Sequence, residues 1–161
     1  MTGPVPRATL VAFLLPLIAL AGAWGSQLIG GLYPCEMCHW QRWPHYAALA
    51  VATLALVAPP RARRALTLVA ALLVAVSGVI GVTHAGVEYH WWRGFTGCTQ
   101  TLALTGTTAA ERFDQLMAAP LVRCDVPQWT LGGVSLAGFN AIWSLGGAAL
   151  VVVMTLARRV R

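Results

Sequence analysis

The chain alternates long apolar runs with short polar segments, and four of the runs predict helices. We expect spans at approximately residues 8–32, 37–58, 65–87 and 134–157. Because a helix needs about 20 residues to cross the hydrocarbon core of a bilayer, the pattern predicts an all-α membrane protein. The expected fold is a four-transmembrane-helix bundle that forms a single integral membrane domain over residues 1–161.

The second apolar run is the shortest of the four, since it lies between Trp43 and Pro59. It crosses a bilayer comfortably only if its helix begins near Met37 and carries Arg42 at the outer end. An arginine just inside a span is costly and therefore requires a reason. Either Arg42 snorkels to the interface, or its charge is held against a reacting group, which is the interpretation we favour.

Two loops join the spans on one side of the bundle, at residues 33–37 and 88–132. Within the longer loop, Thr108 and Glu111 have the spacing of a capping box, and apolar residues follow at helical intervals. The sequence therefore predicts a short amphipathic helix in this second loop. We expect that helix to lie on the bilayer surface or against the helix ends.

Composition and charge support a membrane protein with a defined orientation. The chain is 58% hydrophobic and 10% charged, with a formal net charge of +6. Arginine-rich short loops remain in the cytoplasm, and one face of the predicted bundle carries arginines without any acid: Arg7, Arg61, Arg63, Arg64, Arg158, Arg159 and Arg161. Both termini are therefore expected to be cytoplasmic and both loops to lie on the outer side of the membrane, and the positive charge does not indicate a nucleic-acid partner.

A cleavable signal peptide is the competing interpretation of the N-terminus. Arg7 precedes the apolar run, and residues 21–23 resemble a small-residue cleavage site. The run continues past that site to Leu32, whereas the apolar core of a signal peptide is typically about 7 to 15 residues long. A membrane span is therefore the favoured prediction.

The candidate chemistry lies in four cysteines, Cys35, Cys38, Cys98 and Cys124, all at or beyond the predicted outer surface. Disulfides persist in an oxidising compartment such as the bacterial periplasm. Cys35 and Cys38 form a C-x-x-C pair where the second span begins, and a helix N-terminus or a nearby arginine stabilises a thiolate. Helical spacing places both cysteines on the same face as Arg42, so the guanidinium is expected to point at the sulfurs.

The second pair, Cys98 and Cys124, brackets the amphipathic segment. This pair is either an inert staple for a long loop or, beside a C-x-x-C, part of a sulfur relay. Structural zinc sites usually offer two close cysteine pairs, whereas only one pair is close here, so no metal is expected. Four histidines near the outer ends of the spans either flank a bound ring or hydrogen-bond at the interface: His39, His45, His84 and His90.

The segment Pro34–Arg42, with the sequence PCEMCHWQR, resembles the signature of the DsbB family, disulfide bond formation protein B. Residues 86–98, residues 124–129 and the stretch from Ser135 to Asn140 are also similar to that family. Together with the four spans and both loop lengths, the resemblance covers nearly the whole chain.

The resemblance implies an enzyme of the bacterial inner membrane that makes disulfides. A reduced DsbA-like partner, a periplasmic protein of the thioredoxin fold, would attack Cys98 while Cys124 departs, and Cys124 would then attack Cys35 to free Cys38. Cys38 would donate to ubiquinone or menaquinone in the bilayer, with Arg42 stabilising the negative charge. In that family, the transfer of electrons from the partner protein to the quinone keeps the periplasm oxidising.

His90 is a further candidate contact for the quinone. At rest, we expect Cys35 to pair with Cys38 and Cys98 to pair with Cys124.

Two alternatives remain open from the sequence. The vitamin K epoxide reductase family also couples cysteine pairs to a quinone in a helical bundle, but its C-x-x-C lies toward the last helix, whereas Cys35 and Cys38 follow the first. The chain would otherwise be a non-enzymatic membrane scaffold stapled by two inert disulfides, with Arg42 merely snorkelling.

Overall fold

The structure is a computed structural model that describes residues 5–94, 108–118 and 122–157. The chain is mostly helical. Its elements in chain order are α1 (Arg7–Leu28), α2 (Glu36–Val57), α3 (Pro60–Glu88), α4 (Ala109–Ala118), β1 (Thr130–Leu131), β2 (Val134–Ser135) and α5 (Leu136–Ala157).

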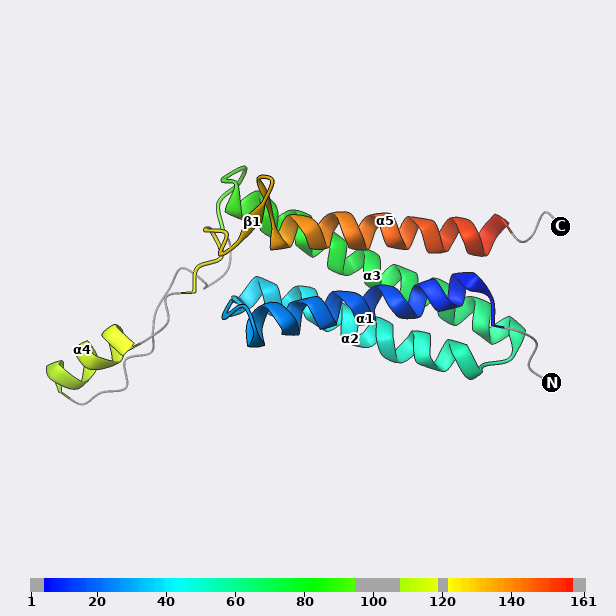
Figure 1. Cartoon of the computed structure of the whole chain (residues 1–161), viewed down its shortest axis with the longest axis horizontal. Coiled ribbons are helices and arrows are strands. Elements are labelled where there is room, and N and C mark those ends of the chain that lie inside the picture. Colours follow the sequence, from blue (N-terminus) through cyan, green and yellow to red (C-terminus); the bar gives the residue numbers. More distant parts are fainter. Residues whose placement is uncertain (1–4, 95–107, 119–121, 158–161) are drawn as a thin grey trace.

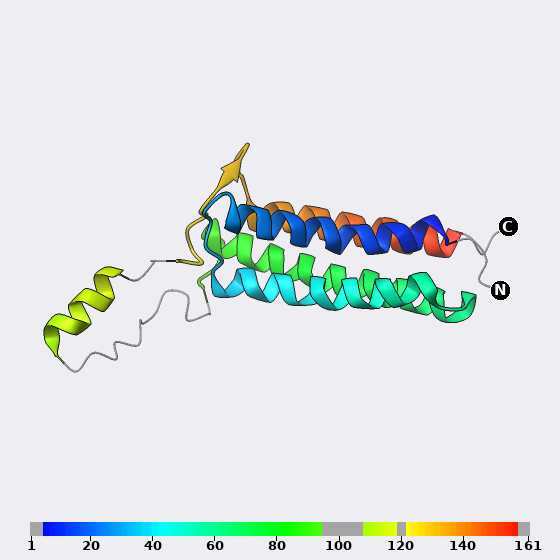
Figure 2. The ribbon, with the colours of Figure 1, turned by 60° about the horizontal axis from the view of Figure 1, so that its bottom comes forward.

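The helices α1, α2, α3 and α5 lie side by side in one bundle (Figures 1 and 2), in which α3 packs against both α2 and α5. Three of them, α1, α3 and α5, are long and apolar enough to cross a membrane. Helix α2 has the same length as α1, but polar residues crowd its first half: Glu36, His39, Gln41, Arg42 and His45. The described helices thus provide three candidate spans on composition, where the sequence pattern predicted four.

The helix ends differ from the predicted limits at two places. Helix α1 ends at Leu28 rather than near residue 32. Helix α3 begins at Pro60, ahead of the expected residue 65, because proline is well suited to the first position of a helix, where no N–H bond is lost. The inner arginine cluster therefore belongs to the first turns of α3 rather than to a turn between helices.

Small residues form the core and let the helices approach closely. The main buried cluster draws on every long helix: Ala12, Leu15, Ala52, Ala70, Ala71 and Val151. Between α3 and α5 the contact is tighter still, since a Cβ on Gly81 would lie 3.0 Å from both the Ala137 carbonyl oxygen and the Ala141 nitrogen. Such small-residue interfaces are typical of helices that associate in membranes.

A β-hairpin, which the sequence pattern did not predict, leads into α5. Strands β1 and β2 pair antiparallel, and the turn between them has Gly132 at φ 59° and Gly133 at φ 81°, values that favour glycine. Ser135 follows at the helix start, and its Oγ accepts a 3.1 Å hydrogen bond from the Gly138 nitrogen. Ser135 therefore caps α5, as its position in the sequence predicted.

Helix α4 stands apart from the bundle, beyond the end at which α3 finishes and α5 begins (Figure 1). The reciprocal bonds of a capping box are present at its start. The Thr108 nitrogen donates to Glu111 Oε2 at 3.1 Å, and the Glu111 nitrogen donates to Thr108 Oγ1 at 3.2 Å.

Large apolar side chains cover the outside of the bundle instead of its centre. Exposed examples from three helices are Val57, Leu72, Val79, Ile142 and Val153. A soluble monomer rarely exposes a contiguous apolar surface of this kind, whereas the hydrocarbon of a bilayer would cover it.

Candidate functional site

The two cysteines of the C-x-x-C pair meet at the first turn of α2. Cys35 is the N-cap, and its sulfur accepts a bond of 3.3 Å from the Cys38 nitrogen. Both are free cysteines, with the Cys35 Sγ donating to the Cys38 Sγ over 3.1 Å. The structure thus holds the pair as thiols rather than as the disulfide expected at rest, although a disulfide needs only about 1 Å of approach from here.

Cys35 holds its proton firmly in this arrangement. Its side-chain hydrogen bond to Cys38 and then its burial, with 4% of the residue exposed, raise the pKa of the Cys35 thiol. Cys35 therefore acts as the donor of the pair and Cys38 as the acceptor.

Cys124 of the second loop lies in the same buried cluster as Cys35. The cluster comprises Cys35, Met37, Val87 and Cys124, with Cys38 packed against it. Cys124 is 2% exposed and disulfide-bonded. The fold thus brings cysteines from both predicted pairs into one packed group, while Cys98 lies outside the described residues.

Arg42 is buried beside the cysteines, with 8% of the residue exposed. Its guanidinium donates to Gln27 Oε1 at 2.7 Å and to the Ala23 carbonyl at 3.0 Å, and it lies 5.5 Å from the centre of the Trp24 ring. These hydrogen bonds hold the guanidinium against α1, yet Arg42 and Cys38 line the same cavity.

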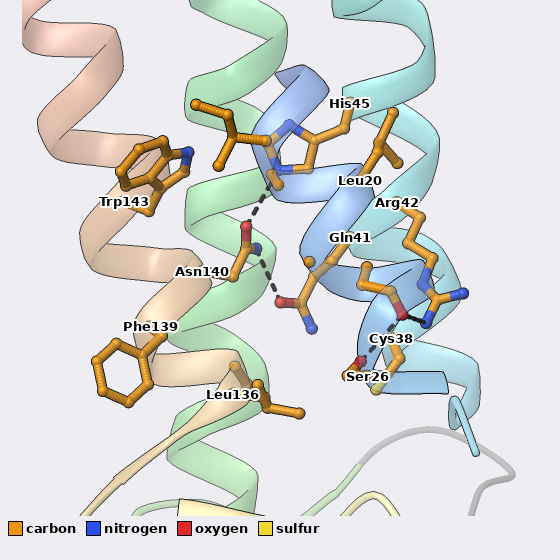
Figure 3. Close-up of a pocket in the computed structure, with 15 residues that line it drawn as sticks. Leu20, Ser26, Cys38, Gln41, Arg42, His45, Leu136, Phe139, Asn140 and Trp143 are labelled. Atoms are coloured by element: carbon orange, nitrogen blue, oxygen red, sulfur yellow. Dashed lines mark hydrogen bonds between the residues drawn. The ribbon is translucent and has the colours of Figure 1, made fainter. Parts of the chain in front are cut away.

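That cavity lies between α1, α2 and α5 and has a volume of about 340 Å³. Figure 3 shows Cys38 and Arg42 at one end and His45 at the other, with Phe139 and Trp143 across from them on α5. Most of the wall is apolar, and polar groups enter it mainly from α2. Such a lining is typical of a site for a flat, largely apolar molecule with a few polar atoms.

His84 on α3 is the imidazole nearest to the sulfurs among the described contacts. Its Nε2 lies 3.5 Å from the Cys35 Sγ, and its Nδ1 lies 2.8 Å from Gln41 Nε2. Glu88, one helical turn further along α3, places Oε1 3.8 Å from His84 Nε2. The other carboxylate oxygen of Glu88 accepts a short hydrogen bond from the Ser135 hydroxyl.

A polar network continues from Gln41 into the middle of the bundle. Asn140 Nδ2 donates to Gln41 Oε1 at 2.8 Å, and Asn140 Oδ1 lies 3.0 Å from His45 Nε2. Ser77 and Ser144 complete the network. The sequence singled out neither Gln41 nor the serines, although polar residues at helical spacing inside apolar runs were an available signal.

The four histidines singled out from the sequence have different surroundings. His84 contacts Cys35, His45 lines the large cavity and His39 is exposed. His90 has a φ of 60° in the turn after α3, and its Nδ1 lies 3.0 Å from the Glu88 carbonyl oxygen. His90 is absent from the described lining of the cavity between α1, α2 and α5.

One group of side chains is close enough to hold a metal ion. It comprises Cys35, Cys38 and His84, whose potential ligand atoms lie within 4.8 Å of one another. The sequence spacing alone did not indicate this group, because His84 comes from a different helix. Two thiols and an imidazole are also the components needed for thiol exchange, which requires no metal.

Comparison with known proteins places this arrangement in a family. The chain is 22% identical over 138 residues to a protein of Rickettsia prowazekii (strain Madrid E) described as uncharacterized protein RP370, covering 84% of this chain and 79% of that protein. No solved structure matches. The family described as disulfide bond formation protein DsbB matches residues 6–154. Because that match extends over nearly the whole chain, the chain belongs to the DsbB family and is a membrane oxidoreductase of disulfide bond formation.

Proposed function

We propose that this protein reoxidises a periplasmic dithiol protein of the thioredoxin fold, like DsbA, and passes the electrons through two cysteine pairs to a membrane quinone. The observation that carries the proposal is that Cys124 belongs to the same buried cluster as Cys35, while Cys38 lines a cavity. A relay requires that sulfur atoms of the two cysteine pairs can meet, and that the last sulfur lies beside a site for an electron acceptor.

The sulfur relay begins at the second pair. In the proposal, Cys98 receives the attack of the partner thiolate and Cys124 leaves as a thiolate. Cys124 then attacks the Cys35 sulfur of an oxidised first pair, which releases Cys38 as a thiolate. Each exchange forms one disulfide and breaks another, so electrons move between pairs without net oxidation. The shared burial of Cys124 and Cys35 supports the central step.

The cavity beside Cys38 fits a quinone ring. Its volume of about 340 Å³ and its apolar walls on α1 and α5 match a lipid-soluble ring, and its opening among membrane helices matches a ligand that arrives from the bilayer. Ubiquinone or menaquinone would supply the final two-electron sink, which makes the exchange directional. Once Cys35 is a thiol again, closure of the Cys35–Cys38 disulfide would release two electrons, which Cys38 would deliver from one wall of this cavity.

Arg42 would favour negative charge where the electrons leave the protein. Its side chain is held by Gln27, by the Ala23 carbonyl and by the Trp24 ring, so its position is fixed before a ligand binds. A guanidinium that shares the cavity with Cys38 stabilises both a thiolate and a quinone oxygen that gains charge. Preorganised charge of this kind lowers a barrier without any reorganisation at the moment of reaction.

The proposed orientation places the cysteines in the periplasm and both termini in the cytoplasm. Arg7 at the start of α1 and the arginine cluster at the start of α3 lie at one end of the bundle, and the cysteine cluster lies at the other end (Figure 2). Arginines favour the cytoplasmic side. The proposal requires α2 to cross the bilayer as a fourth span, with Arg42 toward its periplasmic end.

The test is an assay with the purified protein in detergent, a reduced thioredoxin-fold dithiol protein and a soluble ubiquinone analogue. Loss of quinone absorbance reports turnover, and counting of free thiols on the partner reports its oxidation. We expect both signals only when all three components are present, and we expect Cys38→Ser to abolish both. The Cys38→Ser variant changes one sulfur at a residue that is not fully buried, so the fold should survive.

A purified protein that binds quinone yet leaves the partner reduced would reject the proposal. The scaffold alternative predicts that outcome, together with disulfides that survive brief exposure to a reduced partner. Labelling of the cysteines in intact cells provides the independent test of orientation, because thiols that face the cytosol would overturn the proposed periplasmic partner.

A further inference from the structure

We propose that Gln41 is a positioning residue that fixes the tautomer of His84, so that the His84 Nε2–H faces Cys35 and a one-way chain of hydrogen-bond donors ends on Cys38. The inference rests on the proposed function, because it explains why Cys38, rather than Cys35, carries negative charge toward the cavity. It goes further by assigning a role to a buried amide network that the sulfur relay itself does not use.

The orientation of the Gln41 amide is set by a main-chain carbonyl. Its Nε2 lies 3.2 Å from the Met37 carbonyl oxygen, which can only accept a hydrogen bond. The nitrogen, not the oxygen, must therefore occupy that position. The same nitrogen lies 2.8 Å from His84 Nδ1, so an amide N–H points at this imidazole nitrogen.

Asn140 enforces the same orientation from the other side. Its Nδ2 lies 3.2 Å from the Ser77 carbonyl oxygen, again a group that only accepts. Asn140 therefore presents N–H to Gln41 Oε1, at 2.8 Å. Reversing the Gln41 amide would place two N–H groups against each other here and two oxygens against each other at Met37.

The tautomer of His84 follows from these two amides. A neutral imidazole carries one hydrogen, and the nitrogen that faces an N–H donor must be the acceptor. His84 Nδ1 is thus unprotonated, and the hydrogen sits on Nε2. The ring also hydrogen-bonds the main chain of Cys124, and Nε2 lies 3.5 Å from the Cys35 sulfur and 3.8 Å from Glu88 Oε1.

The donors then point in one direction through the site. Gln41 donates to His84, whose Nε2–H lies against the Cys35 sulfur and is shared with the main chain of Cys124. Cys35 in turn donates its thiol hydrogen to Cys38 over 3.1 Å. A sulfur that already accepts from an N–H keeps its own hydrogen free to be donated onward. Cys38 receives the last hydrogen bond, and hydrogen bonds to a charged acceptor favour its charged form.

The experiment uses the full-length protein, chemically reduced, in detergent micelles without quinone or partner. Nitrogen-15 NMR of labelled histidine reports which ring nitrogen of His84 is protonated, and His84→Asn identifies the signal. Brief alkylation followed by mass spectrometry gives the ratio of modified Cys35 to modified Cys38. For the wild type, we expect hydrogen on Nε2 alone and alkylation mainly at Cys38.

Gln41→Glu replaces the N–H donor by an acceptor of the same shape, so His84 Nδ1 should acquire a hydrogen. With Nε2 released to accept from Cys35, the ratio of Cys35 to Cys38 alkylation should rise about tenfold, the size expected for one hydrogen bond to a charged group. Gln115→Glu is the matched control, because Gln115 belongs to α4, which stands apart from the bundle. The control should change neither the His84 nitrogen-15 signal nor the alkylation ratio.

A wild-type spectrum with hydrogen on Nδ1 would overturn the proposal, and this result does not depend on whether any variant folds. An unchanged His84 signal in a folded Gln41→Glu protein would overturn it as well. A protein that fails to oxidise its partner but shows both expected signals would reject the proposed function and leave this inference standing.

Discussion

The Cys35 sulfur and His84 Nε2 lie 3.5 Å apart, although 49 positions separate the two residues in the chain. The contact joins the N-cap of α2 to the outer end of α3. The local environment of the first cysteine pair consequently depends in part on α3, a helix that carries no cysteine. Substitutions on α3 and α5 should therefore alter the redox behaviour of α2.

Cys124→Ser should separate the two halves of the proposed relay. Turnover with a thioredoxin-fold dithiol protein should fall to background, because no sulfur remains to attack Cys35. Oxidation of a small dithiol such as dithiothreitol by quinone, through Cys35 and Cys38 alone, should persist. Parallel assays with the protein substrate and the small dithiol measure the difference, and equal loss in both assays would contradict a relay through Cys124.

Arg42→Met should weaken quinone use more than it weakens the fold. Removal of the guanidinium leaves the cavity without the positive charge beside Cys38, and one hydrogen bond to a charged group is worth about tenfold in binding. We therefore expect the KM for quinone to rise by at least about tenfold, measured by steady-state quinone absorbance. Arg42→Lys is the control that keeps the positive charge but loses the geometry of the guanidinium. Its KM for quinone should lie between those of the wild type and Arg42→Met.

The sequence was sufficient for the helices because their signals are local. Apolar runs of span length, the Ser135 cap and the Thr108–Glu111 capping box each depend on neighbouring residues. Both caps are present, and three of the four predicted spans are helices long and apolar enough to cross a membrane. The hairpin before α5 was missed because its strands are only two residues long and its signal, Gly132-Gly133, also fits an ordinary loop.

The site was predictable only in part because its geometry depends on contacts between helices. Spacing along one helix placed Cys35, Cys38 and Arg42 together, but it did not reveal that the Arg42 hydrogen bonds go to α1. No periodicity within a segment could select His84 from the four histidines. That selection depends on the packing of α3 against α2, as does the bond between Gln41 and His84.

Ser135→Ala should destabilise the protein by about 1 to 3 kcal/mol. The hydroxyl caps α5 through the Gly138 nitrogen and also donates to buried Glu88, so its loss removes a helix cap and leaves a buried carboxylate short of a donor. Thermal unfolding in detergent, followed by circular dichroism, measures the effect. Thr53→Ala is the control, since the hydroxyl of exposed Thr53 donates to the Leu49 carbonyl within its own helix, and a loss as large there would contradict the role of Ser135.

Gly81→Val should separate α3 from α5 and disturb the amide network at a distance from the sulfurs. Even a Cβ at Gly81 would lie 3.0 Å from the main chain of α5 and 3.1 Å from Asn140 Nδ2. Because main-chain atoms cannot rotate away, overpacking here should cost about 1 to 3 kcal/mol.

The control is Gly146→Val on α5, where a Cβ would meet nothing within 4 Å and where valine should raise helix stability slightly. Thermal unfolding of the two variants should therefore shift in opposite directions from the wild type. The His84 signal in nitrogen-15 NMR should change only in Gly81→Val, because only that substitution displaces Asn140 and with it Gln41. An equal loss of stability in both variants would show that the loss does not arise from the α3–α5 contact, and an unchanged His84 signal in Gly81→Val would show that Gly81 is not what holds Asn140 in place.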